Sequence, residues 1–433
     1  MPLYLKVLIA VVSGAVLGVT FGSDPYLFGL KNEYLGQLGT LVVRLLKALA
    51  TPLILFAILD GFIRSELSAR HGMRLLAICL INVSVAMAIG LAIMNTWSPG
   101  TAWAGDLAAL TREVESKSPG PLVPPQRAPN VSLNPLSNLA GYVPESLLEP
   151  FLKNNVLSIV LLALLGGVAL RAVRRSQHAA GDLRGIESLE RAVGTVYQVL
   201  VQMLEWIILI VPFAVFGVVA QVVGKAGIGV FGILWVFLLT ILAGLALHSL
   251  VYYPAVAWLF GGKRPSVYLR GGADAILTGL STNSSLATVP VTLKCLTEKL
   301  GVSDRSARLS ACVGTNLNND GITLYEAMTA LFLAQAAGYA LSLPQQGVVL
   351  MASVFAGAGI AGIPEAGLIV LPLVLGAVGL PDAMIAAAIP LILPVDWIIA
   401  RCRSAVNVMS DMLVAILLDR LESTSADGTD SKQ

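Results

Sequence analysis

A series of long apolar segments constrains this chain more than any other feature. Six of them cover about residues 3–19, 38–62, 73–94, 156–173, 193–222 and 230–259. A helix of roughly 18 residues or more can cross the ~30 Å hydrocarbon core of a bilayer. Only 12% of the 433 residues are charged, about half the share found in soluble domains. With the interrupted segments described below, we expect an all-α membrane protein with about eight transmembrane helices.

Basic residues beside the ends of these segments indicate an orientation. They follow the chain start and the second, fourth and sixth segments: Lys6; Arg64, Arg70 and Arg74; Arg171, Arg174 and Arg175; Lys263 and Arg264. Because cytoplasmic loops carry an excess of Lys and Arg, this side is predicted to face the cytoplasm. We expect a multi-pass protein of the cell (inner) membrane with both termini cytoplasmic. A net charge of +2 gives no indication of a nucleic-acid partner.

The three histidines do not suggest an enzyme. His71, His178 and His248 are scattered, and no nucleophile, base and orienting residue form a recognisable arrangement with them. We expect neither catalysis nor a resident cofactor.

The apolar pattern changes after Arg264, where small and polar residues interrupt the segments. Residues 275–292 contain Ser281-Thr-Asn-Ser-Ser285, and residues 349–374 contain several glycines and a proline. Irregular backbone at membrane depth persists only when it is buried in protein or faces an aqueous cavity. Both segments therefore predict re-entrant hairpins, each followed by a longer helix, at 309–336 and 383–418. This order predicts inverted repeats and places a transporter site among these elements.

Polar residues recur through the last apolar segment at steps of three or four. Asp396, Ala400, Arg403, Asn407 and Asp411 fall on one face of a helix at about 100° per residue. A guanidinium stays charged and can hold a carboxylate through two parallel hydrogen bonds, so Arg403 is the natural anion ligand. Asp411 could bind a hard cation. In the alternative, Arg403 and the two aspartates only neutralise one another.

Two further segments carry candidate ligands. Asn316-Leu-Asn-Asn-Asp-Gly321 is a run of poor helix formers, so we expect the helix to unwind there. Freed carbonyls and the Asp320 carboxylate would then offer oxygen ligands suited to Na⁺. Ser284 and Ser285, at the presumed tip of the first hairpin, offer donors for a carboxylate, although such loops also occur without a ligand.

Four motifs in this order resemble those of the dicarboxylate/amino acid:cation symporter family. The similarity covers about residues 7–418, and its strongest parts are Ser284-Ser-Leu-Ala-Thr-Val-Pro-Val-Thr292, Asn318-Asn-Asp-Gly-Ile-Thr-Leu-Tyr-Glu326, Ala361-Gly-Ile-Pro-Glu-Ala-Gly367 and residues 395–411. The resemblance implies a homotrimer, with a scaffold and a transport domain that moves like an elevator.

The resemblance also divides the chain into regions. Residues 1–97 hold the first part of the scaffold (helices 1 and 2) and helix 3; 98–152 a Pro-rich outward-facing loop; 153–260 helices 4 to 6; 265–422 the transport core; and 423–433 a polar cytoplasmic tail.

Site roles follow from the same resemblance. It implies that Ser285 and Asn407 hold the substrate's main carboxylate and that Arg403 holds an acidic side chain; Ser284 and Ser404 are grouped with them. The residues that match cation ligands are Gly314, Asn318, Asn407 and Asp411 for one sodium site, and Asn318 and Asp320 for part of another. Glu326 matches a proton-carrying glutamate, a role that suits a buried carboxyl because desolvation favours its neutral form. The alternative is a hydrogen-bonded core glutamate without a transport role.

Several departures from the family pattern bear on substrate and coupling. Ala400 replaces the Asp that binds a substrate amino group, which favours a dicarboxylate over an amino acid unless Glu365 on the second hairpin supplies the missing charge. Ile322 replaces a Thr that helps Arg hold an acidic side chain, and Asn319 replaces a Met between two sodium sites. On the third helix, Cys79, Asn82 and Val83 stand where family members with a full set of sodium ligands have Tyr, Thr and Ser, and Asn82 is the candidate cation ligand among them.

We therefore expect a secondary active symporter for a small organic anion, a dicarboxylate or acidic amino acid, coupled to Na⁺, H⁺ or both. The alternatives are a transporter of neutral or other amino acids and an uncoupled anion channel or binding sensor on the same fold.

Overall fold

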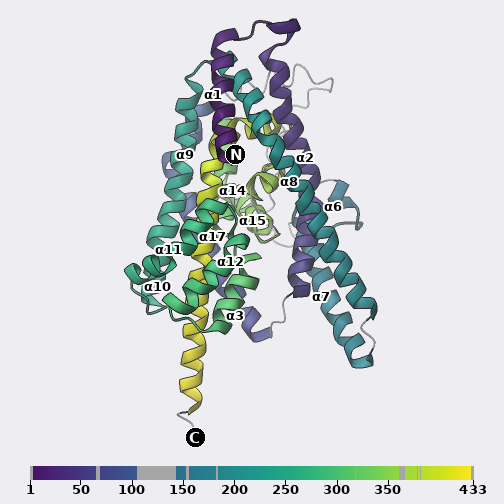
Figure 1. Cartoon of the computed structure of the whole chain (residues 1–433), viewed down its shortest axis with the longest axis vertical. Coiled ribbons are helices and arrows are strands. Elements are labelled where there is room, and N and C mark those ends of the chain that lie inside the picture. The colour runs from purple at the N-terminus through teal and green to yellow at the C-terminus, as the bar shows by residue number, and fades with distance from the viewer. Residues whose placement is uncertain are drawn as a thin grey trace.

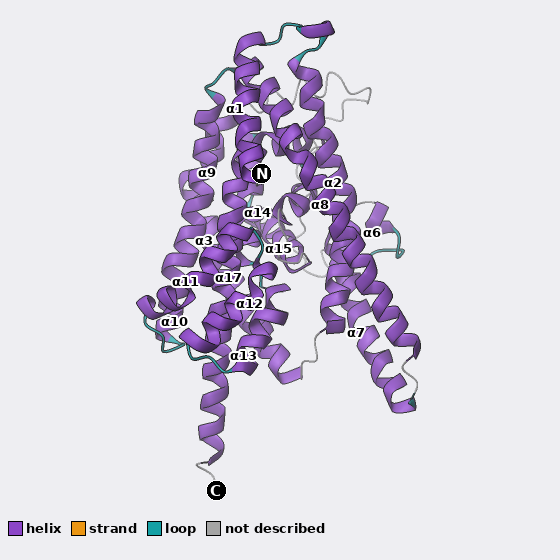
Figure 2. Cartoon of the chain, viewed as in Figure 1, coloured by secondary structure: helices purple, strands orange, loops and turns teal. Residues whose placement is uncertain are grey.

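The computed structural model describes residues 3–64, 69–104, 143–152, 156–181, 184–316, 318–359, 366–377, 379–380 and 382–430. Every regular element within these ranges is helical (Figure 2). The predicted all-α class is thus confirmed for the part of the chain that is described.

The helices of the first half begin and end close to the predicted apolar segments. They are α1 Leu3–Phe21, α2 Asn32–Arg64, α3 Ala69–Trp97, α7 Val156–Ala180, α8 Arg184–Ala226 and α9 Val230–Ala246. Beyond α9 the helix continues through a π-helical segment, Leu247–Tyr252, into α10, Tyr253–Leu259. Most of the predicted loop at 98–152 lies outside the described residues, apart from a 3-10 turn, Pro99–Trp103, and α6, Glu149–Leu152.

By length and composition, three described helices could each cross a bilayer. They are Gly72–Trp97, Arg184–Lys225 and Leu234–Leu259, and shorter apolar helices lie at Leu5–Phe21, Thr51–Asp60 and Leu343–Gly357. The predicted total of about eight spans remains a prediction.

The first hairpin has the predicted helix–turn–helix form, with longer arms than expected. α11, Pro265–Thr282, ends at Asn283, whose left-handed backbone (φ 54°) reverses the chain into α12, Ser285–Lys294. A π-helical turn, Cys295–Lys299, extends the second arm. Lys299 Nζ lies 2.7 Å from Asp274 Oδ2, so the two arms run antiparallel and meet again away from the tip.

The following helix is broken where the sequence predicted. After α13, Asp304–Arg308, a π turn (Leu309–Val313) and a 3-10 turn (Gly314–Asn316) lead to α14, Asp320–Ala336. Asn319 has non-helical backbone angles (φ −106°, ψ 50°). The backbone therefore leaves the α-helical path just before Asp320.

The last elements are α15 Leu343–Gly359, α16 Ala366–Ala377 and α17 Asp382–Asp430. α15 and α16 pack against each other, and the residues between them, 360–365, lie outside the described part. α17 is longer than the predicted 383–418 and carries much of the predicted polar tail as helix.

Two groups of helices are visible in Figure 1. α2 packs along α8 and α7, and α1 packs along α8. Gly14 and Gly18 of α1 allow a close approach of the α1 and α8 backbones. A Cβ at position 14 would lie 2.6 Å from Phe216 O, and a Cβ at position 18 would lie 2.8 Å from Ala220 O, both on α8. Small residues at such spacing let membrane helices approach backbone to backbone.

The second group surrounds α17, which contacts α9, α11, α12, α14 and α16. α14 lies between α3, α15 and α17, and almost all its residues are buried.

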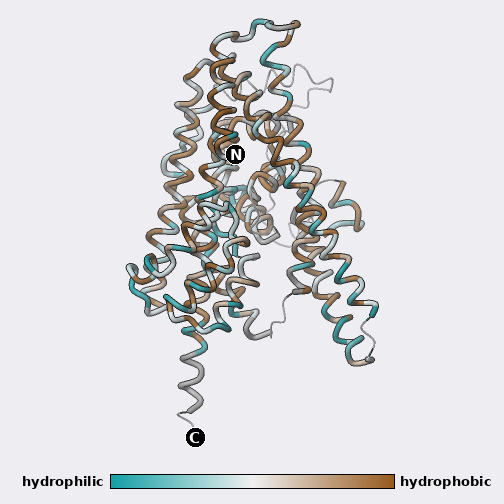
Figure 3. Tube along the Cα trace, viewed as in Figure 1, coloured by the Kyte–Doolittle hydropathy of each residue, from teal (hydrophilic) through white to brown (hydrophobic). Residues whose placement is uncertain are grey.

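Large apolar side chains elsewhere are exposed, such as Val12 and Val16 on α1 and Trp206 and Phe213 on α8. Figure 3 shows polar residues gathered near the end of α7 and the α10–α11 connection. An exposed apolar surface of this extent fits contact with lipid.

Candidate functional site

One face of α17 forms the wall of the candidate site. Asp396, Ala400, Arg403, Asn407 and Asp411 are each no more than 2% exposed. The prediction that these five residues share a buried helix face is therefore confirmed. Charged groups in such a position need partners, because an uncompensated buried charge costs several kcal/mol.

Arg403 is enclosed by three elements. Its Nη2 lies 3.4 Å from Asp396 Oδ2, about two helical turns earlier, and its Cζ lies 4.0 Å from the centre of the Tyr325 ring on α14. A Cβ at Gly367 of α16 would lie 2.6 Å from the Arg403 Cζ, so any other residue there would displace the guanidinium from this position. Asp396 is thus placed to neutralise Arg403, as the alternative expects, whereas the Asp411 carboxylate accepts a hydrogen bond from Asn318 Nδ2.

The tip of the first hairpin meets α17 and the broken segment. Ser404 Oγ donates to Asn283 Oδ1 at 3.2 Å, and Thr315 Oγ1 lies 3.4 Å from Ser285 Oγ. The Ser284 hydroxyl accepts from Ala287 N at 3.1 Å and caps the N-terminus of α12. In this structure Ser284 therefore has a capping role, whereas the Ser285 hydroxyl and the first free amides of α12 lie at the tip.

Asn407 holds the broken segment against α17. Its Oδ1 accepts from Gly321 N at 2.9 Å, and its Nδ2 donates to Asn319 Oδ1 at 3.2 Å. Asn319 in turn donates to Gly357 O of α15 at 2.9 Å. Both ends of the Asn407 amide are thus used to join α17, the break and α15.

The first predicted cation site is assembled around Asp411. Asn318 Nδ2 donates to Asp411 Oδ1 at 3.3 Å, and the Asn318 amide N donates to Gly314 O at 2.7 Å. Ser310 Oγ donates to Asp411 O at 2.6 Å. The structure brings Gly314, Asn318 and Asp411 together, with Asn407 one turn before Asp411.

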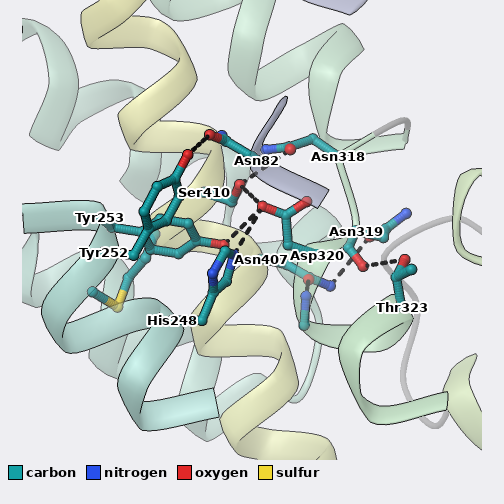
Figure 4. A network of polar contacts seen from close by, with 12 residues as sticks. Asn82, His248, Tyr252, Tyr253, Asn318, Asn319, Asp320, Thr323, Asn407 and Ser410 are labelled. Atoms are coloured by element: carbon teal, nitrogen blue, oxygen red, sulfur yellow. Dashed lines mark hydrogen bonds and ion pairs between the residues drawn. The ribbon is translucent and has the colours of Figure 1, made fainter. Parts of the chain in front are cut away.

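The second predicted cation site is centred on Asp320 and is shown in Figure 4. Tyr253 Oη and Ser410 Oγ lie 2.9 and 2.8 Å from Asp320 Oδ2, and His248 Nε2 lies 3.4 Å away. Asn82 of α3 accepts from Tyr252 Oη at 2.9 Å. All these groups except Tyr252 are buried.

The remaining candidates differ in their surroundings. Ile322 and Ala400 are buried, and Glu365 lies outside the described residues. Glu326 is fully buried, and neither of its carboxyl oxygens has a hydrogen-bond partner among the described residues. Those residues therefore do not supply the hydrogen bonds expected of an ordinary core glutamate.

Sequence reasoning missed several members of these networks. His248, Tyr252 and Tyr253 contact the predicted ligands Asp320 and Asn82, although His248 had been seen only as a lone histidine in an apolar segment. Tyr325 and Asn283 were not singled out. A useful signal would have been the four side chains capable of hydrogen bonding, those of His248, Ser249, Tyr252 and Tyr253, within six residues of an otherwise apolar segment.

Comparison of the sequence with known proteins shows the family to which the chain belongs. The sequence model of the sodium:dicarboxylate symporter family matches residues 3–421. Excitatory amino acid transporter 3 of Mus musculus is 28% identical over 97% of this chain and 85% of its own length. Excitatory amino acid transporter 1 of Ambystoma tigrinum is 28% identical over 95% of this chain and 82% of its own length. An excitatory amino acid transporter of Caenorhabditis elegans is 34% identical over 64% of this chain and 53% of its own length.

Because the family match spans nearly the whole chain, the chain belongs to the sodium:dicarboxylate symporter family, whose members are membrane transporters and not enzymes.

Proposed function

We propose that this chain is a secondary active symporter that moves a small dicarboxylate across the membrane together with a cation. The observation that carries the proposal is the buried Arg403, enclosed by α14, α16 and α17 beside the tip of the first hairpin. A guanidinium in a site of low dielectric is a strong and selective partner for a carboxylate.

Each substrate carboxylate has its own partner in this proposal. Arg403 binds one carboxylate, and its contact to Asp396 uses one of the five N–H donors of the guanidinium. Ser285 and Asn407 orient the other carboxylate at the N-terminus of α12, where helix amides favour an anion. Substrate binding would then exchange the Asn407 contacts to Asn319 and Gly321 for contacts to the ligand.

The coupling cation is assigned to the group around Asp411. The Asp411 carboxylate of α17, and the Asn318 side-chain oxygen and Gly314 carbonyl of the broken segment, are the oxygen ligands that a hard cation prefers. Na⁺ is the first choice for this site. Glu326 is the candidate for H⁺, because a buried carboxyl without hydrogen-bond partners is most stable when it is neutral.

Ala400 supports a dicarboxylate over an amino acid. It is buried on the same face as Arg403 and offers no charge to a substrate ammonium group. The known relatives are named as excitatory amino acid transporters, which favours the second candidate, an acidic or other amino acid. That candidate requires a replacement charge, and Glu365 is the residue to supply it.

The assembly and topology are proposed from the family. We infer a homotrimer with a scaffold that includes α1, α2, α7 and α8 and with a moving core that contains both hairpins, α14 and α17. The end of α7 and the α10–α11 connection lie at the lower end of Figure 1, as does the C-terminus. These basic segments support cytoplasmic placement of that end, in the inner membrane of the cell.

Uptake into liposomes tests the proposed function. The purified chain is reconstituted, Na⁺ and pH gradients are imposed separately, and uptake of labelled succinate is competed with malate, fumarate, aspartate, glutamate and neutral amino acids. We expect competition by the C4 dicarboxylates and weak competition by amino acids. Concentrative aspartate uptake that succinate and malate leave unchanged would exclude the dicarboxylate preference.

A further inference from the structure

A π-helical segment and the first residue of α10 contribute three side chains to the polar contacts around Asp320 and Asn82. Between α9 and α10, residues Leu247–Tyr252 form π-helix, and Tyr253 begins α10. The His248 ring stacks on Tyr252 (centroids 5.0 Å apart, planes at 11°) and meets Tyr253 edge-on (4.5 Å, 63°). π-helical turns inside longer helices are frequent at functional sites, because they change the direction in which side chains point.

His248 and Tyr253 are hydrogen-bonding neighbours of the Asp320 carboxylate. The Tyr253 hydroxyl donates to Asp320 Oδ2 at 2.9 Å. His248 Nε2 lies 3.4 Å from the same atom and donates to it in the tautomer that carries its proton on Nε2, and Ser410 Oγ donates to it at 2.8 Å. In Figure 4 these contacts converge on one carboxylate oxygen from the side of α10 and α17.

A neighbouring oxygen on this side is also used by a donor, since Asn82 Oδ1 accepts from Tyr252 Oη at 2.9 Å. Ser410 Oγ lies 3.1 Å from Asn318 Oδ1 as well as 2.8 Å from Asp320 Oδ2, and its one hydrogen is shared between these two oxygens. Hydroxyl oxygens can bind sodium as well as donate, but here three side chains already meet a single carboxylate oxygen, Asp320 Oδ2. At the other predicted site Asn318 Nδ2 donates to Asp411 Oδ1 over a longer 3.3 Å. The Asp320 carboxylate therefore has partners within the protein that can take the place of an ion.

We propose that His248 and Tyr253 close the Asp320 carboxylate against sodium, so that hydrogen bonds replace the ion at the second predicted cation site. The inference rests on the proposed sodium coupling and narrows it to the Asp411 site. Physically, a buried carboxylate must be compensated, and donors held by packed aromatic rings provide this compensation without an ion. His248 and Tyr253 are thus determinants of cation stoichiometry and do not contact the substrate.

The test measures sodium binding to the full-length protein in detergent. The rise of the unfolding temperature with NaCl, relative to equal choline chloride, is compared between the wild type and the double variant His248→Phe/Tyr253→Phe. Because each additional bound ion adds its own stabilisation, we expect a larger sodium-dependent shift in the double variant. Tyr268→Phe is the matched control, since it removes another buried hydroxyl, one that donates to Met409 O at 2.6 Å; its shift should equal that of the wild type.

Two comparisons can overturn the proposal. Equal sodium shifts in the wild type and the double variant would contradict it. Adding Asp320→Asn to the double variant should return the shift to the wild-type value, and a shift that stays enlarged would also contradict it. If the double variant does not purify as folded protein, Tyr253→Phe alone, which keeps the ring, takes its place with the same expected direction.

This experiment measures sodium binding in the absence of any transported carboxylate. A wild type that binds sodium but takes up no carboxylate into liposomes would refute the proposed function and leave the comparison at Asp320 intact.

Discussion

At the residue scale, the pair formed by Arg403 and Asp396 determines the charge balance of the site. Both side chains are buried and lie 3.4 Å apart on α17. Removing two such charges from water costs several kcal/mol per ion, and their attraction offsets this cost only in part. We interpret the pair as retained for binding: Asp396 keeps the guanidinium compensated before a substrate carboxylate arrives.

A charge at position 400 should change which substrate is preferred. Ala400→Asp places a carboxylate one helical turn before Arg403, where it can pair with a substrate ammonium group. We expect the ratio of aspartate to succinate uptake to rise at least about tenfold, equivalent to ~1.4 kcal/mol. Competition in liposomes measures the ratio. Ala400→Asn controls for size, and an equal rise in this uncharged variant would show that charge is not the cause.

Glu326 should make the rate of uptake depend on the pH gradient across the membrane. Glu326→Gln keeps the shape of the side chain and removes its titratable proton. We expect uptake driven by an acidic outside to lose its dependence on the pH gradient, because the carrier of the proton is gone, while a sodium gradient still drives uptake. Uptake is measured at fixed sodium with the inside and outside pH varied independently. A response to the pH gradient that survives in the variant would rule out Glu326 as the proton carrier.

At the element scale, the break before α14 is what brings separate elements into one site. The chain leaves the helix at Asn319, and Asn407 holds the first turn of α14 through Gly321 N. α17 and α14 come close there, since a Cβ on Gly321 would lie 2.6 Å from Arg403 O. The break is therefore fixed by packing and is not a loose loop.

Filling this contact should damage the site. Gly321→Ala forces α14 away from α17, and we expect a loss of about 1–3 kcal/mol of stability from overpacking together with loss of uptake. Thermal unfolding in detergent and liposome uptake measure the two effects. Gly347→Ala in α15 is the control, because nothing lies within 4 Å of its Cβ position. Equal behaviour of the two variants would contradict the packing argument.

The elements differ in how far the sequence could predict them. The break at 316–321 was predictable because Asn, Asp and Gly all compete with helical hydrogen bonding. The face of α17 was predictable from its spacing. The π-helical segment between α9 and α10 was not, since its residues are ordinary for an apolar helix and the turn depends on tertiary packing. Contacts such as His248 to Asp320, 72 positions apart, also depend on how the helices assemble.

At the scale of the whole molecule, two groups of helices carry different kinds of contact. α1, α2, α7 and α8 pack through apolar side chains and close glycine approaches, whereas the elements around α17 meet through buried polar networks. Composition predicted the membrane class, but neither hydropathy nor periodicity could predict which helices pack together. The division into a scaffold and a moving core follows from these contacts as a proposal.

The central claim is that sodium drives a carboxylate into a site held by Arg403. The most direct measurement is uptake of labelled succinate into liposomes under an inward sodium gradient, for the wild type, Arg403→Ala, Arg403→Lys and Arg401→Ala. Arg401 is the matched control, because its Nη1 donates to Trp397 O at 3.1 Å on the same helix. Arg403→Lys keeps a positive charge beside Asp396 but cannot make the two parallel hydrogen bonds by which a guanidinium holds a carboxylate.

We predict that the wild type and Arg401→Ala accumulate succinate above the outside concentration and that a sodium ionophore abolishes this accumulation. Arg403→Ala should lose uptake at least about a hundredfold, as expected for ~3 kcal/mol of carboxylate binding, and Arg403→Lys should be impaired while folding normally. Succinate that only equilibrates through the wild type would indicate a channel, and accumulation that persists in both Arg403 variants would contradict the account.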